Sequence, residues 1–145
     1  MSRFLLDVNA VVALVDPAHV FHADAHAWLA ANKRARLLTS PIVQNGVVRV
    51  LSQPGYPNST GTAAAARQLV AAFCDQARHE FVPDDLSITD TPLLVRPDLL
   101  TPSNLTDVYL LALAVEHEAR LATFDRRIPT AAVKHGSAAL ELLHH

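Results

Sequence analysis

The chain has 145 residues, of which 50% are hydrophobic and 18% are charged, and its formal net charge is −2 at pH 7. These values predict one compact domain spanning 1–145, and they exclude both a disordered chain and a uniformly basic nucleic-acid-binding protein. No apolar run approaches the roughly 20 residues of a membrane span, and the apolar run at the start is too short for a secretory leader, so we expect a cytoplasmic protein that does not enter a membrane.

Segments with strand character and segments with helix character alternate along the chain. Short apolar runs bounded by turn residues predict strands, and apolar residues three or four positions apart predict helices. We expect strands at 3–6, 36–39, 80–82 and 120–124. We expect helices at 9–15, 22–31, 41–51, 62–78 and 104–118, followed by a short strand or helix at the end. This alternation predicts an α/β fold with a mostly parallel sheet.

Residue types that favour helix starts and loops refine these boundaries. Ser40 followed by Pro41 predicts a helix that begins at Pro41 with the Ser40 side chain as its N-cap. Ser103 is expected to cap the helix that begins near position 104. Prolines interrupt the 84–100 segment, so no long helix is expected there, and 53–58 has the composition of a loop.

Three aspartates stand in positions where a carboxylate does not favour stability. Asp7 and Asp125 each follow an apolar strand directly, and Asp107 lies at the front of an apolar helix. A carboxylate beside an apolar interior must be paired or must bind a metal. Because ligands of parallel sheets bind outside the carboxyl ends of the strands, we expect the three side chains to converge there.

Three converging carboxylates would repel one another, and a divalent cation would offset that repulsion. Ligands that are all oxygen suit Mg²⁺, with Mn²⁺ as the alternative. A cation held in this way can activate water and stabilise charge on a phosphate, which is the chemistry of phosphodiester hydrolysis. The aspartates therefore predict a metal-dependent hydrolase acting on phosphate esters.

With these motifs in place, the chain resembles the PIN-domain ribonucleases, and within them the VapC-type toxins of bacterial toxin–antitoxin pairs. The resemblance rests on the order and spacing of motifs at 5–10, 39–43, 48–51, 105–114 and 120–125. It implies a PIN-like three-layer sandwich, in which a short, mostly parallel sheet is flanked by helices. It also implies a Mg²⁺-dependent endoribonuclease that cleaves RNA and is neutralised by a partner antitoxin. A homodimer is the expected assembly.

The resemblance assigns roles to individual positions. Asp7 matches the family's first metal-binding acid, Asp107 matches its later acid on a helix, and Asp125 matches the acid after a Thr-Phe pair. Asn9 and Thr123 stand two residues from Asp7 and Asp125, where the family tends to place polar groups near the site.

One departure from the family pattern lies in the helix after Ser40. Relatives usually carry a glutamate there, whereas this chain reads Gln44, Asn45 and Gly46. Gln44 or Asn45 could offer a neutral oxygen to the metal or its waters. The site would then be less negative by about one charge, so we expect weaker metal binding and reduced activity.

Other polar residues admit two interpretations. Arg49 either binds a phosphate or lies on a solvated helix face, and the arginines at 126 and 127 either contact the RNA backbone or pair with Asp125. The histidines at 19, 22 and 26 have the spacing of metal ligands but lack an acidic partner, so a helix surface is the favoured interpretation.

Two further functions compete with the ribonuclease. The missing glutamate favours a catalytically weak PIN domain that binds RNA or its antitoxin as a regulatory module. A phosphatase with an aspartate nucleophile would require a second aspartate at position 9, where this chain has Asn9. The sequence names neither the RNA that is cut nor the antitoxin, and it does not tell whether His144 and His145 are native.

Overall fold

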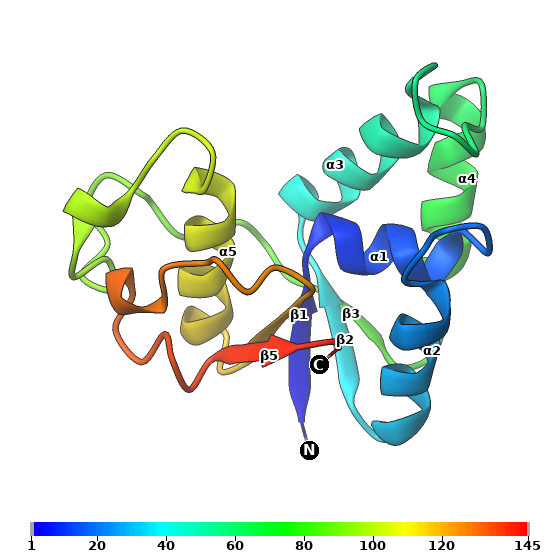
Figure 1. Ribbon diagram of the computed structural model, residues 1–145. Helices are drawn as coiled ribbons and strands as arrows, with labels where there is room; N and C mark the ends of the chain where they lie inside the picture. The colour runs from blue at the N-terminus through cyan, green and yellow to red at the C-terminus, as the bar shows by residue number, and fades with distance from the viewer. Residues whose placement is uncertain (1, 145) are drawn as a thin grey trace.

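Within residues 2–144, which the computed structural model describes, five short parallel strands form one sheet (Figure 1). In chain order they are β1 (Arg3–Leu6), β2 (Arg36–Thr39), β3 (His79–Phe81), β4 (Arg120–Thr123) and β5 (Leu140–Leu142). They lie side by side in the order β3-β2-β1-β4-β5, and every neighbouring pair is parallel. The prediction of an α/β fold around a parallel sheet is confirmed.

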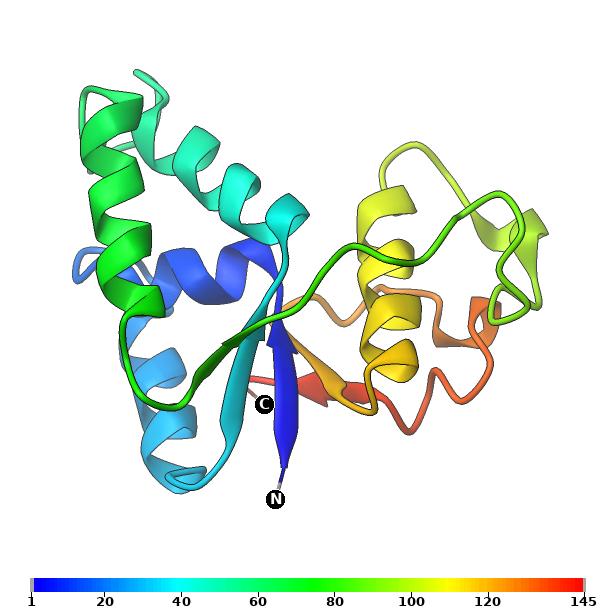
Figure 2. The same ribbon diagram turned by 180° about the vertical axis from the view of Figure 1, so that it is seen from behind.

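Helices cover both faces of the sheet and complete three layers. On one side lie α1 (Val8–Val15), α2 (His22–Ala31), α3 (Pro41–Ser52) and α4 (Ala63–Cys74). On the other side lies α5 (Leu105–Glu116) with two single turns, η1 (Pro97–Leu99) and η2 (Thr130–Ala132), as the reverse view shows (Figure 2). No helix in the described part of the chain is long and apolar enough to cross a membrane.

The strand order creates a point where the chain reverses its direction across the sheet. From β1 the chain adds β2 and β3 on one side, and it then crosses to the other side of β1 to form β4 and β5. The carboxyl ends of β1 and β4 are therefore neighbours whose following segments diverge. Open parallel sheets bind ligands at such a reversal point.

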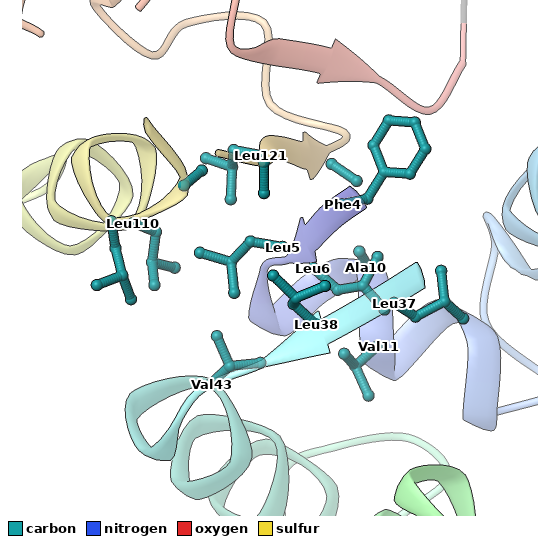
Figure 3. Packing of buried hydrophobic residues seen from close by; sticks show 14 of the residues in the cluster. Phe4, Leu5, Leu6, Ala10, Val11, Leu37, Leu38, Val43, Leu110 and Leu121 are labelled. Carbon is teal, nitrogen blue, oxygen red and sulfur yellow. The ribbon is translucent and has the colours of Figure 1, made fainter. Parts of the chain in front are cut away.

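The two faces of β1 anchor the two helical layers. Phe4 faces α2, where its ring packs edge-on against Trp28 with centroids 4.9 Å apart. Leu5 is directed toward α5, near Leu110 and Leu121 (Figure 3). In α5, all seven residues from 108 to 114 are buried, because the sheet covers one side of this helix and the 82–104 segment with η2 covers the other. A helix that is apolar on all faces must be enclosed in this way.

Several predicted boundaries and two predicted caps differ from the structure. The helix predicted at 62–78 ends at Cys74, because the chain must turn before β3 begins at His79. Thr62 is its N-cap, and its hydroxyl accepts a hydrogen bond from the Ala65 amide. The cap of α5 is Asn104, not Ser103, and its side chain bonds to the preceding loop and not to the helix. Ser40 does precede α3, but its side chain makes no capping bond.

The histidines at the start of α2 stabilise the end of α1. His22 Nδ1 lies 2.7 Å from the carbonyl oxygen of Ala13, and His26 Nε2 lies 2.9 Å from that of Leu14. Both carbonyls belong to the last turn of α1, where helices lack partners for their final carbonyl groups. The two histidines therefore join α2 to α1, which agrees with the interpretation that they are not metal ligands.

Asp16, directly after α1, ties the loop between α3 and α4 to the core. Its side chain is 5% exposed and accepts hydrogen bonds from the Tyr56 hydroxyl and the Asn58 amide, the latter at 2.6 Å. These two hydrogen bonds lower the pKa of Asp16 against the opposing effect of burial. The loop is thus held by a buried, charge-assisted network.

We predict that Tyr56→Phe destabilises the protein by about 1–3 kcal/mol, because Asp16 loses a donor while it remains buried. Ser103→Ala serves as the control, since it removes an exposed hydroxyl whose partner, the Thr101 hydroxyl, is exposed as well. Urea unfolding of both variants measures the difference. Equal free energies of unfolding for the two variants would show that the Asp16 network contributes nothing.

Candidate functional site

Asp7 lies where β1 ends and α1 begins. Its backbone is extended, with φ −78° and ψ 175°, and its side chain is the N-cap of α1. Oδ1 accepts a hydrogen bond of 2.8 Å from the Ala10 amide, while the Asp7 amide donates to the Ala122 carbonyl of β4 at 3.3 Å. Only 5% of the residue is exposed. The carboxylate is therefore fixed against the sheet by both elements that meet there.

A hydroxyl from β4 holds the other carboxylate oxygen. Thr123 Oγ1 donates to Asp7 Oδ2 at 2.5 Å and accepts a hydrogen bond of 3.0 Å from the Asp125 amide. Thr123 is fully buried, so water does not compete for its hydroxyl. One buried hydroxyl thus links the segments that follow β1 and β4.

The three predicted aspartates share one electrostatic environment. Burial raises the pKa of Asp7 to about 6; the hydrogen bonds from Thr123 and Ala10 oppose this shift, and the charges of Asp107 and Asp125 add to it. Burial and the charge of Asp125 also raise the pKa of Asp107, against an opposing effect of Arg127. The three charges therefore lie within range of one another, near the carboxyl ends of β1 and β4 that Asp7 and Asp125 follow.

Arg127 partly neutralises this group. Asp125 Oδ1 accepts hydrogen bonds from the Arg127 amide at 2.8 Å and from Arg127 Nε at 3.3 Å. The Arg127 side chain is 91% exposed, so its guanidinium group remains accessible beside the carboxylates. The pairing with Asp125 agrees with one of the two interpretations of this arginine and leaves the other open.

The carboxylate oxygens suit a hard divalent cation, although they do not form a complete coordination shell. Among residues 2–144, no three acidic, histidine or cysteine side chains lie close enough together to ligate one ion directly. Each carboxylate offers about four lone-pair sites, and Asp7 uses only two of them. A cation such as Mg²⁺, which keeps several waters, could be held by part of the group directly and by the rest through water.

In α3, the three residues that stand where the family pattern has a glutamate point in different directions. Gln44 Nε2 donates to Thr39 Oγ1 at 3.0 Å and lies 3.6 Å from Cys74 Sγ, so its amide serves a polar cluster between α3 and α4. Asn45 is exposed. Gly46 faces the first turn of α1, where an added Cβ would lie 2.5 Å from Val8 Cγ2. Of these three positions, 46 is therefore the one that packs against the start of α1, directly after Asp7 in sequence.

The remaining candidates lie outside this group. Asn9 is exposed on the first turn of α1. Arg49 lines a groove of about 1160 Å³ between α3 and α4, together with Gln44 and Arg67. The structure thus links Asp7, Thr123 and Asp125 by hydrogen bonds and sets Asp107 within electrostatic range of the other two aspartates, whereas Arg49 lies on a different surface.

The sequence did not predict the surroundings of two residues near this edge. Asp84, in the loop after β3, accepts a hydrogen bond of 2.9 Å from the Ile42 amide and so caps α3 from outside the helix. Ser40 is fully buried without a partner for its hydroxyl. In the sequence, Asp84 could have been noticed only as an acid shortly after a strand. Ser40 could have been noticed as a polar residue that directly follows a buried strand.

Comparisons with known proteins point to one family. The PIN domain family matches residues 4–134. Ribonuclease VapC44 of Mycobacterium tuberculosis is 44% identical over 131 residues, which cover 90% of this chain and 92% of that protein. Ribonuclease VapC38 of the same organism is 38% identical over 140 residues, which cover 96% of each chain.

Two solved structures share the fold at lower identity. The crystal structure of Mycobacterium tuberculosis VapC20, described as a sarcin-ricin loop cleaving toxin, has a TM-score of 0.61 at 19% identity and covers 90% of this chain and 96% of its own. The crystal structure of VapBC2 from Rickettsia felis, bound to a DNA fragment from their promoter, has a TM-score of 0.59 at 17% identity. The match covers 97% of this chain and 98% of that chain.

The raised pKa of Asp7 predicts a pH dependence of stability without metal. The folded state binds the proton more tightly than the unfolded state, so stability falls as pH rises from about 4 to above 6, by up to about 3 kcal/mol. Asp7→Asn keeps an N-cap residue and removes the charge, so it should remove this fall. Urea unfolding in EDTA across this pH range compares the two proteins. A variant that is much less stable than the parent at neutral pH would contradict the prediction.

We predict that Gly46→Ala destabilises the protein by about 1–3 kcal/mol, because its Cβ would overlap Val8. Combined with Val8→Ala, the same change should become neutral or favourable, since alanine is the better helix former. Gly55→Ala is the control, as no atom lies within 4 Å of its added Cβ. Thermal unfolding of the four variants tests this, and equal effects of Gly46→Ala in both backgrounds would exclude the close approach.

Proposed function

Because the chain belongs to the PIN-domain family, and within it to the VapC ribonucleases, we propose that it is the toxin of a toxin–antitoxin pair and hydrolyses RNA at a divalent metal held by Asp7, Asp107 and Asp125. The family membership makes it an endoribonuclease of the toxin type. The position of the metal is supported by a single observation, the mutual electrostatic effect of the three aspartates at the carboxyl ends of β1 and β4.

The residues of the chain prepare the site in two ways. Thr123 and the Ala10 amide hold both oxygens of Asp7, so that this ligand needs no reorientation. Arg127 leaves its guanidinium exposed beside Asp125, where it can meet a phosphate of the RNA backbone. When bound, Mg²⁺ or Mn²⁺ would polarise water and neutralise charge that develops on the phosphate. Site formation by all-oxygen ligands favours these ions over zinc.

The partners follow from the family. A cognate antitoxin is expected to bind the toxin, as the VapBC2 complex illustrates for a protein of the same fold. A homodimer in the cytoplasm is the assembly that we propose for the free toxin. Size-exclusion chromatography with light scattering measures the dimer directly.

A second function, a catalytically weak PIN domain that binds RNA or its antitoxin, has one specific observation in its favour. On α3, the position that packs against the start of α1, directly after Asp7, is Gly46, which carries no side chain to ligate a metal. The weaker acid set is expected to raise the metal concentration required for activity. At saturating metal, a nuclease with a weak metal site cleaves RNA, whereas a regulatory module does not.

We predict that the purified chain cleaves RNA in millimolar Mg²⁺ or Mn²⁺ and that EDTA abolishes cleavage. Asp7→Asn, Asp107→Asn and Asp125→Asn should each reduce cleavage by about 100-fold or more, since losing an outer-shell partner alone costs 10–100-fold. Asp24→Asn, an exposed change on α2, should leave the rate unchanged. Binding of RNA without cleavage at saturating Mn²⁺ would favour the regulatory module.

A further inference from the structure

Ser40 carries a buried hydroxyl that makes no hydrogen bond to its surroundings. None of its surface is exposed, and its Oγ has no hydrogen-bond partner among residues 2–144. A buried polar group without a partner costs free energy, so its presence in a well-packed site requires an explanation.

The usual explanation, capping of the following helix, does not apply. Ser40 precedes α3 in an extended conformation, with φ −118° and ψ 169°, but makes no side-chain bond to the helix. Asp84 Oδ2 accepts the hydrogen bond from the Ile42 amide at the start of α3 instead. The hydroxyl of Ser40 is therefore left free for another acceptor.

The strand register, continued past the ends of β1 and β2, sets Ser40 next to Asp7. Leu5 pairs with Leu38, so the same register continued by two residues sets Asp7 opposite Ser40. Leu6 pairs with Ala122, so continuing by one residue sets Asp7 opposite Thr123. Neighbours in register point to the same face of a sheet. Asp7 is thus flanked by one hydroxyl residue on each side, of which only Thr123 is bonded to it.

We propose that Ser40 is a positioning residue for Asp7, and that its hydroxyl donates to the Asp7 carboxylate when that carboxylate holds the metal. Asp7 has lone pairs to accept this bond, because only two of about four are in use. Outer-shell donors of this kind fix which lone pairs of a ligand face the metal. This inference rests on the proposed function, in which Asp7 is a metal ligand.

Calorimetric titration of Mn²⁺ into the whole protein tests the proposal in the parent, Ser40→Ala, Asp7→Asn and the double variant. Ser40→Ala should weaken Mn²⁺ binding by about 10-fold, and it should have no further effect in an Asp7→Asn background. In RNA cleavage, Ser40→Ala should lower kcat and leave KM unchanged. Without metal, its urea midpoint should stay the same or rise, since the change removes an unpaired polar group.

Thr62→Ala is the matched control, because Thr62 does cap its helix. It should lower the urea midpoint and leave Mn²⁺ affinity unchanged. If Ser40→Ala behaves as Thr62→Ala does, or weakens Mn²⁺ binding equally in the Asp7→Asn background, the proposal for Ser40 is wrong while the metal site stands. If Asp7→Asn alone leaves Mn²⁺ affinity unchanged, the metal site at Asp7 is wrong, and the role of Ser40 falls with it.

Discussion

The buried carboxylate of Asp7 is the constraint on which the arrangement of the site depends. Three independent parts of the fold meet at this residue: the end of β1, the first turn of α1 and the end of β4. Burial disfavours its charged form and raises its pKa to about 6. The fold therefore holds a carboxylate that is costly to ionise alone, and a bound cation would recover that cost. In our proposal this cost is the reason why the site selects a metal.

The strand order explains why the other acids gather near Asp7. Since the chain reverses between β1 and β4, Thr123 and Asp125 follow a strand that is adjacent to β1 in space but far from it in sequence. The helix α5 packs on the face that carries Leu5 and brings Asp107 within electrostatic reach. Arg127 offsets part of the negative charge without closing the site, because its side chain remains exposed.

Sequence patterns predicted most of the fold because apolar periodicity and strand alternation are local signals. Asp7 and Asp125 were found for the same reason: each directly follows an apolar strand. The hydrogen bond between Thr123 and Asp7 was beyond such reasoning, since it depends on the register of strands that are more than one hundred residues apart in sequence. Ser40 has the residue type of a cap, yet Asp84 supplies the cap from a distant loop. Likewise, Gln44 could not be oriented before its contact with Thr39 was known.

Crystals grown with Mn²⁺ and measured near the manganese absorption edge test the central claim most directly. The account predicts an anomalous peak at the carboxyl ends of β1 and β4, with Asp7 as a direct ligand and Asp107 or Asp125 bound directly or through water. A manganese peak elsewhere in the protein, or no peak at this edge of the sheet in millimolar Mn²⁺, would contradict it.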